Sequence, residues 1–250
     1  MSDSQSLSWI VPDWPAPPWV CSVVTTRCGG VSAEPYSSFN LAEHVGDDPF
    51  AVAHNRKCLN ERFKLPSPPR WLSQVHGIDV VDAALIKPGC IADASHSDQA
   101  GAVCAVLTAD CLPVLLCHRE RMHVAAAHAG WRGLAQGVLA SAVHAMQVPP
   151  GQIMAWLGPA IGPSVFEVGE EVYRAFTEQN PAWREAFKPT LAGRWLADLY
   201  QLARWQLHKL GVTAVYGGHW CTYTDAQRFY SYRRDGVTGR MASLIWMKSQ

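Results

Sequence analysis

Short apolar runs recur along the chain, each bounded by Gly, Pro or polar residues. Runs of about four to eight such residues are typical of strands in a well-buried sheet. The pattern predicts strands at residues 21–26, 75–81, 102–108, 112–117, 123–128 and 153–157. Three more runs predict strands towards the C-terminus, at residues 212–216, 229–233 and 242–246.

Apolar residues step by three and four positions between residues 131 and 146, which predicts one amphipathic helix there. Another helix is predicted from about residue 49 to residue 63, because Asp47 or Asp48 can cap it and Pro49 suits its first turn. Further helices are predicted at 169–178 and 196–210. Strands and helices alternate without a repeat or a long linker. The sequence therefore predicts one mixed α/β domain over residues 1–250, with residues 1–20 as an irregular lead-in.

The composition indicates a compact globular protein, because 48% of the 250 residues are hydrophobic and eleven are Trp. Lys and Arg balance Asp and Glu at 21 each, so neither a nucleic acid nor an anionic membrane is an expected partner. We find no export signal and expect a cytoplasmic protein. A disulfide framework is therefore not expected of the eight cysteines, and Cys104 and Cys117 are predicted core residues.

Two histidines and one cysteine follow apolar runs, each beside very small or structure-breaking residues. They are His76 in QVHG, Cys111 in TADC and His128 in AHAGWRG. Zinc accepts two imidazoles and a thiolate, and such a set leaves a fourth position for water or substrate. The three residues are far apart in the chain, unlike the closely paired ligands of a structural zinc site. The pattern therefore predicts a catalytic metal site, with Asp110 beside Cys111.

Arginines and glycines near these residues predict anion binding. The helix expected after His128 begins with unpaired N–H groups, with Arg132 beside them. TTRCGGVS combines Arg27 with two glycines whose N–H groups can turn inward. The segment at 230–236, YSYRRDG, could add a stacking aromatic residue and further cations. Close-packed turns and a solvated strand end are the alternative interpretations of these segments.

Seven segments occur in an order that resembles a known family: TTRCGGVS, FNLAEHVGDDP, WLSQVHG, LTADCLPVLL, AAHAGWRGLAQGVL, WLGPAIGPSVFEVG and FYSYRRDGVTGRMA. They span about residues 22–246. In these segments the chain is similar to the YfiH-like purine nucleoside phosphorylases, which are also described as polyphenol oxidase or laccase-domain proteins.

The resemblance implies a zinc site of His76, Cys111 and His128. It implies phosphorolysis of adenosine, inosine, guanosine and 5′-methylthioadenosine, and hydrolytic deamination of adenosine. Purine nucleosides and phosphate are then the expected partners. The implied fold is a four-layer α/β/β/α sandwich with mixed β-sheets, shared at a distance with cysteine-dependent toxin deamidases.

Within this activity, Asp110 is a candidate to orient a ligand or move a proton. We expect Arg27, Asn40 and Arg132 to contact the substrate or phosphate. The three metal-site residues are also the expected catalytic residues.

Three other interpretations stay open. Cys111 could be the nucleophile of a metal-free hydrolase, with His128 or His76 as its base. A copper-dependent phenol oxidase is the second, although such enzymes need close His pairs of the form HxH, and none of the ten histidines forms one. The third is that the trio only stabilises the fold and catalyses nothing.

Overall fold

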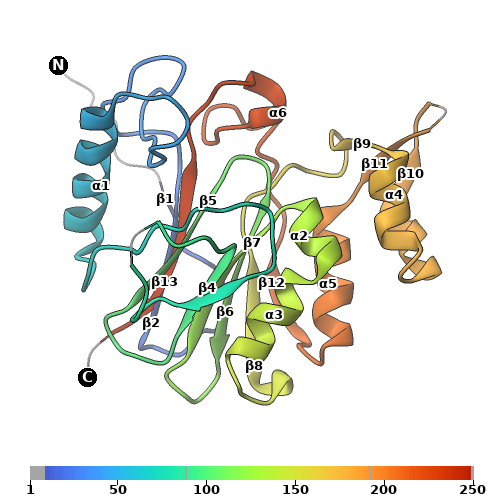
Figure 1. Ribbon diagram of the computed structural model, residues 1–250, viewed down its shortest axis with the longest axis horizontal. Coiled ribbons are helices and arrows are strands. Elements are labelled where there is room, and N and C mark those ends of the chain that lie inside the picture. The colour runs from blue at the N-terminus through green and yellow to red at the C-terminus, as the bar shows by residue number, and fades with distance from the viewer. Residues whose placement is uncertain (1–8, 88, 192, 249–250) are drawn as a thin grey trace.

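The computed structural model describes residues 9–87, 89–191 and 193–248, and its strands form three sheets (Figure 1). The first sheet has the antiparallel order β1-β2-β13-β5, formed by Trp9–Ile10, Val20–Thr25, Met241–Met247 and Val103–Thr108. The second has the order β12-β8-β6-β7-β4-β3, formed by Ala214–Gly217, Ile153–Leu157, Leu112–His118, Val124–Ala129, Ala94–Ser97 and Val80–Asp82. It is mixed, because the pairs β12–β8 and β3–β4 are parallel while the others are antiparallel.

The two large sheets pack face to face. Successive side chains of a strand point to opposite sides, so alternate residues of one strand enter the core between the sheets and the core on the outer side. Leu115 and Cys117 of β6 share a core with Val106 of β5 in the other sheet. Val114 and Leu116, which alternate with them, belong to the core on the outer side of the six-stranded sheet. Every residue of β6 is buried, which explains why residues 112–117 form a continuous apolar run.

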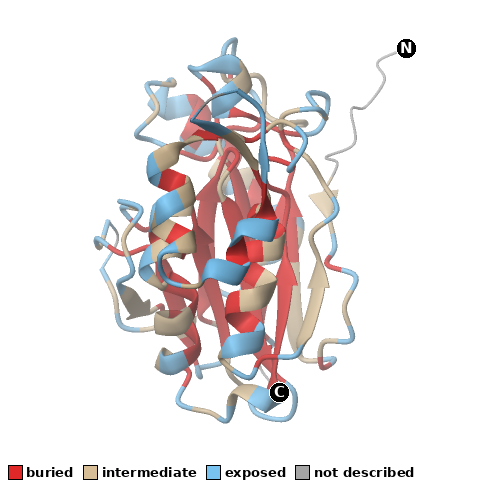
Figure 2. Ribbon diagram, turned by 90° about the vertical axis from the view of Figure 1, so that its right-hand side faces the viewer, coloured by how far each residue is buried: buried red, intermediate tan, exposed pale blue. Residues whose placement is uncertain are grey.

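Helices cover the outer faces of both sheets, giving four layers in the order α/β/β/α (Figure 1). Helix α1 (Pro49–Phe63) packs on the four-stranded sheet, where Leu59 lies in one core with Val23 and Leu244. Helices α3 (Val138–Ala145) and α5 (Leu199–Lys209) lie on the six-stranded sheet. Figure 2 shows the central strands buried and the helices exposed on one side only. The layered α/β fold implied by the resemblance is confirmed.

A third, smaller sheet lies at one end of the long axis of Figure 1. Its antiparallel order is β10-β11-β9, formed by Phe187–Pro189, Arg194–Ala197 and Glu167–Gly169. Helix α4 (Glu170–Thr177) follows β9 directly, and 3-10 helices span Pro150–Gln152 and Pro181–Ala186. The sequence pattern did not predict this sheet, because its strands have three or four residues each.

Most predicted elements are confirmed, and two need correction around the later site. The strand predicted at 75–81 is reduced to β3, because His76 has φ 61° and the backbone turns there. The single helix predicted at 131–146 is two helices, α2 (Trp131–Gln136) and α3, because Gly137 lies between them with φ 104°. The predicted apolar face is nevertheless buried in one core.

One boundary and two elements were also predicted wrongly. Residues 229–233 do not form a strand, since the Ser231 side chain accepts a hydrogen bond from the N–H of Arg234 and begins helix α6 (Tyr232–Asp235). Helix α5 begins at Leu199 rather than 196, because Asp198 caps it and the preceding residues belong to β11. Strand β4 was missed because its sequence, ASHS, is short and polar.

Cys104 and Cys117 are fully buried in the core, as predicted. None of the eight cysteines, all within the described residues, forms a disulfide. Each helix in the described ranges is too short or too polar to cross a bilayer.

Candidate metal centre and active site

The three candidate metal ligands meet at one end of the six-stranded sheet. His128 belongs to β7, Cys111 lies in the turn between β5 and β6, and His76 lies in the loop before β3. One ligand atom from each lies within 4.8 Å of the others. The Cys111 Sγ is 3.7 Å from His76 Nε2, and the two imidazole centroids are 4.9 Å apart. Over the described ranges, this is the one cluster of three or more such side chains.

Glycines beside His128 allow this convergence. A Cβ on Gly130 would lie 2.8 Å from His76 Cδ2 and 2.9 Å from Cys111 Sγ, which is too close for any real side chain. A Cβ on Gly133 would lie 2.8 Å from the carbonyl oxygen of Gly77. The motif AHAGWRG therefore brings the start of α2 against the loop that carries His76.

One buried carboxylate, that of Asp93, holds both histidines in place. Its Oδ1 accepts hydrogen bonds from His128 Nδ1 at 2.7 Å and from the backbone N–H of His76 at 2.9 Å. Its Oδ2 accepts from the N–H groups of Gly77 at 2.7 Å and Val75 at 3.1 Å. Because Nδ1 of His128 is bound in this way, its Nε2 is the nitrogen left for a metal or for Cys111. A carboxylate behind a ligating histidine is a recurrent support of metal sites.

Asp93 was not among the predicted site residues. It lies between Ala92 and Ala94, and no sequence motif there links it to the candidate ligands. Its full burial is the informative property, since a buried carboxylate needs partners, but burial of a single Asp cannot be read from one sequence.

The charges of the cluster support one another. Burial opposes ionisation of Cys111, but His128 and His76 outweigh it and lower the pKa of the thiol to about 6. Burial likewise opposes protonation of His128, but Cys111 and Asp93 raise its pKa to about 9. Burial disfavours the charged form of Asp93 too, yet its hydrogen bonds from His128 and Gly77 lower the pKa of this carboxyl. Without metal, the site therefore holds a thiolate beside an imidazolium at neutral pH.

We expect the thiol of Cys111 to react with iodoacetamide in metal-stripped protein with a pH midpoint near 6. An ordinary cysteine has its midpoint at about 8.5. Because the pKa is lowered, the reactive thiolate predominates above the midpoint, and reactivity is lost as the pH falls through it. The midpoint is measured by alkylating the protein at several pH values and quantifying the modified Cys111 peptide by mass spectrometry. A model thiol peptide is the reference. A midpoint of about 8.5 would show that the histidines do not stabilise the thiolate.

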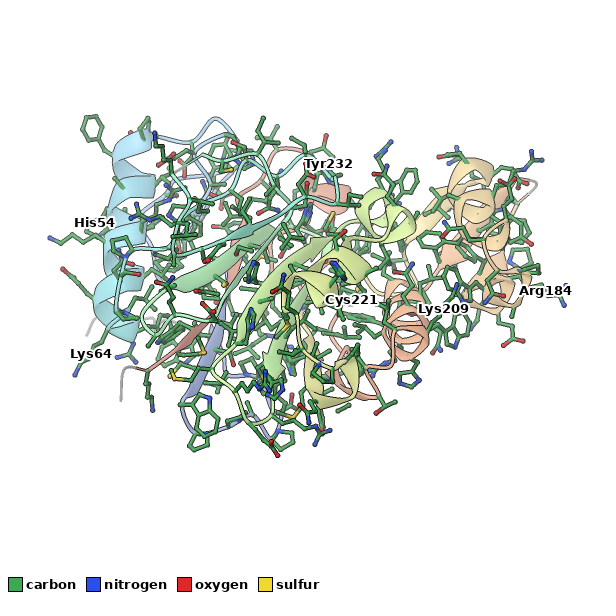
Figure 3. The ribbon with its side chains drawn as sticks, turned by 60° about the horizontal axis from the view of Figure 1, so that its bottom comes forward. His54, Lys64, Arg184, Lys209, Cys221 and Tyr232 are labelled. Carbon is green, nitrogen blue, oxygen red and sulfur yellow. The ribbon has the colours of Figure 1, made fainter. Side chains whose placement is uncertain are left out.

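The cluster opens into a cavity of about 560 Å³, a size that suits a small-molecule ligand. Apolar and aromatic side chains belong to its lining, among them Trp131, Ile161, Phe166, Leu199 and Tyr232. Tyr232, labelled in Figure 3 on α6, exposes 61% of its surface and offers an aromatic ring at the opening. Three arginines also line the cavity: Arg132, Arg233 and Arg240. The cavity thus combines apolar and aromatic side chains with positive charge, beside the three candidate ligands.

Asp110 lies in the cavity wall and is 8% exposed. Its Oδ1 accepts a hydrogen bond from Thr222 Oγ1 at 2.6 Å, and its Oδ2 accepts from the backbone N–H of Arg233 at 2.7 Å. The residue itself has φ 98°, which turns the chain sharply before Cys111. Asp110 therefore ties α6 to the turn that carries the cysteine.

The other predicted contacts are distributed differently. Arg132 lines the cavity, but Arg27 does not, because its guanidinium donates to the carbonyls of Ser37 and Ala226. Asn40 is fully buried, and its Oδ1 accepts from the backbone N–H of Arg240 at 2.9 Å. The structure therefore does not bring Arg27 to the other site residues, and Asn40 supports the cavity from behind. Arg240 was not among the residues predicted to form the site.

The donor set suits a borderline or soft metal ion. Thiolate and imidazole ligands favour zinc or copper over magnesium or calcium, which prefer oxygen. The side chains lie close enough to share one ion, and the Nε2 of His128 is correctly oriented by Asp93. These residues therefore fit a single metal ion with a position open towards the cavity.

The chain is similar to known proteins over nearly its whole length. A family model described as multi-copper polyphenol oxidoreductase laccase matches residues 21–248. The purine nucleoside phosphorylase of Pseudomonas aeruginosa is 54% identical over 244 residues, which cover 96% of this chain and 99% of the relative. The purine nucleoside phosphorylase YfiH of Escherichia coli is 53% identical over 240 residues, or 95% of this chain and 98% of the relative.

Solved structures agree with the fold. The crystal structure of a Neisseria meningitidis protein has 51% sequence identity and a TM-score of 0.94, over 96% of this chain and 99% of the other. That of the protein YlmD from Geobacillus stearothermophilus has 29% identity and a TM-score of 0.86, over 99% of this chain and 100% of the other.

Proposed function

The chain belongs to the family of YfiH-like purine nucleoside phosphorylases, and from this premise we propose that it is a zinc-dependent purine nucleoside enzyme. Its substrates in this proposal are adenosine, inosine, guanosine and 5′-methylthioadenosine, which it cleaves with phosphate, and it also deaminates adenosine hydrolytically. The observation that carries the proposal is the convergence of His76, Cys111 and His128 on a cavity with aromatic and arginine side chains.

In this proposal His76, Cys111 and His128 hold one zinc ion. When bound with an open position, zinc supplies Lewis acidity and lowers the pKa of a water molecule to about 7. Asp93 keeps His128 in the tautomer that presents Nε2, and it fixes the backbone of His76. Gly130 leaves the space in which the three side chains meet.

Phosphorolysis makes a bond between a phosphate oxygen and C1′ of the ribose. The bond from C1′ to the purine nitrogen breaks, and its electron pair leaves with the purine, which then takes up a proton. The arginines of the cavity neutralise the phosphate, while Tyr232 and Phe166 provide faces on which the purine can lie. Asp110 positions Arg233 through its backbone N–H and is the carboxylate placed to exchange a proton in the cavity.

Deamination of adenosine takes place in the same cavity and needs water instead of phosphate. Water adds at C6 of the purine and ammonia leaves, so the products are inosine and ammonia. The purine must present its C6 edge to the candidate ligands in this reaction, whereas C1′ must meet phosphate in phosphorolysis. The aromatic and aliphatic side chains of the lining offer apolar contacts to the purine, which are compatible with both placements.

We expect protein purified without added metal to contain about one zinc per chain and to convert adenosine in two ways. With phosphate present it should form adenine and ribose 1-phosphate, and without phosphate it should form inosine and ammonia. Elemental analysis and chromatography of the products measure both. Active protein that lacks zinc would contradict the zinc dependence, and a failure to form adenine would contradict the phosphorylase.

A metal-free hydrolase is the second candidate, and one observation favours it. Asp93, His128 and Cys111 form a line of carboxylate, imidazole and thiolate, the arrangement that activates a nucleophilic cysteine.

Copper chemistry, which the description of the family model names, is less well supported. The described residues contain a single three-ligand cluster, whereas multicopper sites need several sets of histidines.

A further inference from the structure

Arg240 is the partly buried arginine among the three that line the cavity, while Arg132 and Arg233 are exposed. It lies directly before β13, on a short segment held from behind. Its backbone N–H donates to Asn40 Oδ1, and its Nη1 donates to the carbonyl oxygens of Thr238 at 2.8 Å and Gly239 at 3.0 Å. A Cβ on Gly239 would lie 2.7 Å from the Tyr230 ring, so this segment is tightly packed. The guanidinium is therefore held on a rigid support.

No carboxylate pairs with this guanidinium among the residues that the structure describes. Four other arginines have a carboxylate within 4.0 Å, namely Arg56, Arg174, Arg228 and Arg234. Asp110, the acidic residue among those that line the cavity, already accepts hydrogen bonds from Thr222 and from the backbone of Arg233. A partly buried cation without a paired anion is costly, and this cost is removed when an anionic ligand binds.

The surroundings of Arg240 place such an anion at the centre of the site. Arg240, Cys111 and Asp110 line the same cavity. The guanidinium carbon of Arg240 is 5.8 Å from the centroid of the Tyr232 ring, which also lines this cavity. Burial lowers the pKa of Arg240, and attraction from Cys111 and Asp110 opposes this. An anion bound by Arg240 therefore lies in the cavity that holds the candidate metal ligands and this aromatic ring.

The other two arginines are less suited to this role. Nη1 of Arg233 donates to the carbonyl oxygen of Glu167 at 2.7 Å, and its guanidinium lies 5.3 Å from the centre of the Phe166 ring. Arg132 is exposed, and its guanidinium lies 4.3 Å from the centre of the Trp131 ring, at the start of α2. Both are placed to attract anions to the opening, where water screens their charge.

From these contacts we propose that Arg240 binds the inorganic phosphate that attacks the nucleoside, with its free Nε and Nη2 facing two phosphate oxygens. The planar fork of arginine matches phosphate in this way. Asn40 is then a positioning residue, because it holds the backbone of Arg240. This inference rests on the proposed function and adds the phosphate-binding residue to it.

The test compares Arg240→Gln with Arg132→Gln and with Arg174→Gln, an exposed arginine on α4 that serves as the matched control. We expect Arg240→Gln to raise the KM for phosphate about 10- to 100-fold, the effect of losing a charged hydrogen-bond pair, while the KM for inosine changes less than about threefold. Arg240→Lys should recover part of the loss, because it restores the charge without the fork. Arg174→Gln should leave both constants unchanged.

Equal increases in both KM values for Arg240→Gln would overturn the proposal, as would a larger rise in the phosphate KM for Arg132→Gln. A second measurement uses wild-type protein and so does not depend on folding of a variant. Phenylglyoxal modifies accessible arginines, and saturating phosphate should protect the peptide that carries Arg240 but not that of Arg174. Equal modification with and without phosphate would also overturn the proposal. If phosphate protects Arg240 but the protein cleaves no nucleoside, the phosphate-binding site is supported and the proposed phosphorylase activity is contradicted.

Discussion

Cys111→Ser is expected to lose bound zinc, phosphorolysis and deamination together. The thiolate supplies the sulfur ligand in a cluster whose other ligands are two imidazoles, and a serine hydroxyl is a poor zinc ligand at neutral pH. We expect the variant to retain well below half of the wild-type zinc and to lose at least about 100-fold in turnover. The fold should survive, because the cores on both sides of the six-stranded sheet do not include Cys111.

Zinc stoichiometry and adenosine conversion, measured side by side in the variant and the wild type, separate the two candidate mechanisms. Cys90→Ser is the matched control, because Cys90 is also partly buried and lies outside the cluster. An inactive Cys111→Ser protein that still carries full zinc would contradict the ligand assignment. It would favour the metal-free hydrolase, in which an electrophilic inhibitor should form a one-to-one adduct with wild-type Cys111.

Asp93→Ala is expected to have the largest effect on stability of any single substitution near the site. It leaves three backbone N–H groups and His128 Nδ1 without their acceptor, at the end of a buried strand pair. Removing one partner of such a buried charged network costs about 3–5 kcal/mol. Asp93→Asn keeps the shape of the side chain but replaces one carboxylate oxygen, an acceptor, with an amide NH2 group, a donor. We expect it to fold and to bind zinc about 10- to 100-fold more weakly.

Denaturant unfolding and competition with a zinc chelator measure these two effects. Asp98→Asn is the control, because Asp98 is exposed on the segment that follows β4, and a surface change should alter stability by less than about 0.5 kcal/mol. The pKa of Asp93 is lower in the folded chain than in the unfolded chain. Ionised Asp93 therefore stabilises the fold fully above the pKa of the unfolded chain, about 3.9. This stabilisation is lost as the pH falls through the pKa of the folded chain. Unchanged zinc affinity in Asp93→Asn would show that the carboxylate supports the fold and not the metal site.

The positions of the three candidate metal ligands explain why both sheets are needed for one site. Cys111 follows β5 of the four-stranded sheet and precedes β6 of the six-stranded sheet, so its turn joins the two layers. His128 comes from β7, and His76 from a loop tied to β7 through Asp93. A displacement of one sheet relative to the other would separate the ligands. The packed core between the sheets therefore stabilises the geometry of the site.

Several features could be predicted from the sequence because they depend on local spacing. Strand β8 and helix α1 occur where the apolar runs and a cap at Asp47 or Asp48 predicted them, and the structure shows Asp48 as the cap. The glycines after His128 indicated close approach of the backbone, which the structure shows at Gly130 and Gly133. The three candidate ligands were recognisable as a set because each follows an apolar run beside small residues. The resemblance to a family then implied that they form one zinc site.

Other features were decided by tertiary structure alone. Asp93 became the support of both histidines only because β4 pairs with β7, which places it beside His128. Arg240 enters the cavity because β13 pairs with β5 and begins opposite Thr108, the end of β5 that leads into the turn of Cys111. Arg27 looked equally suitable in the sequence, but the backbone carbonyls around it satisfy its guanidinium. Spacing along the chain determines which way a strand or helix face points, whereas the partner of a buried charge depends on which distant strands pair.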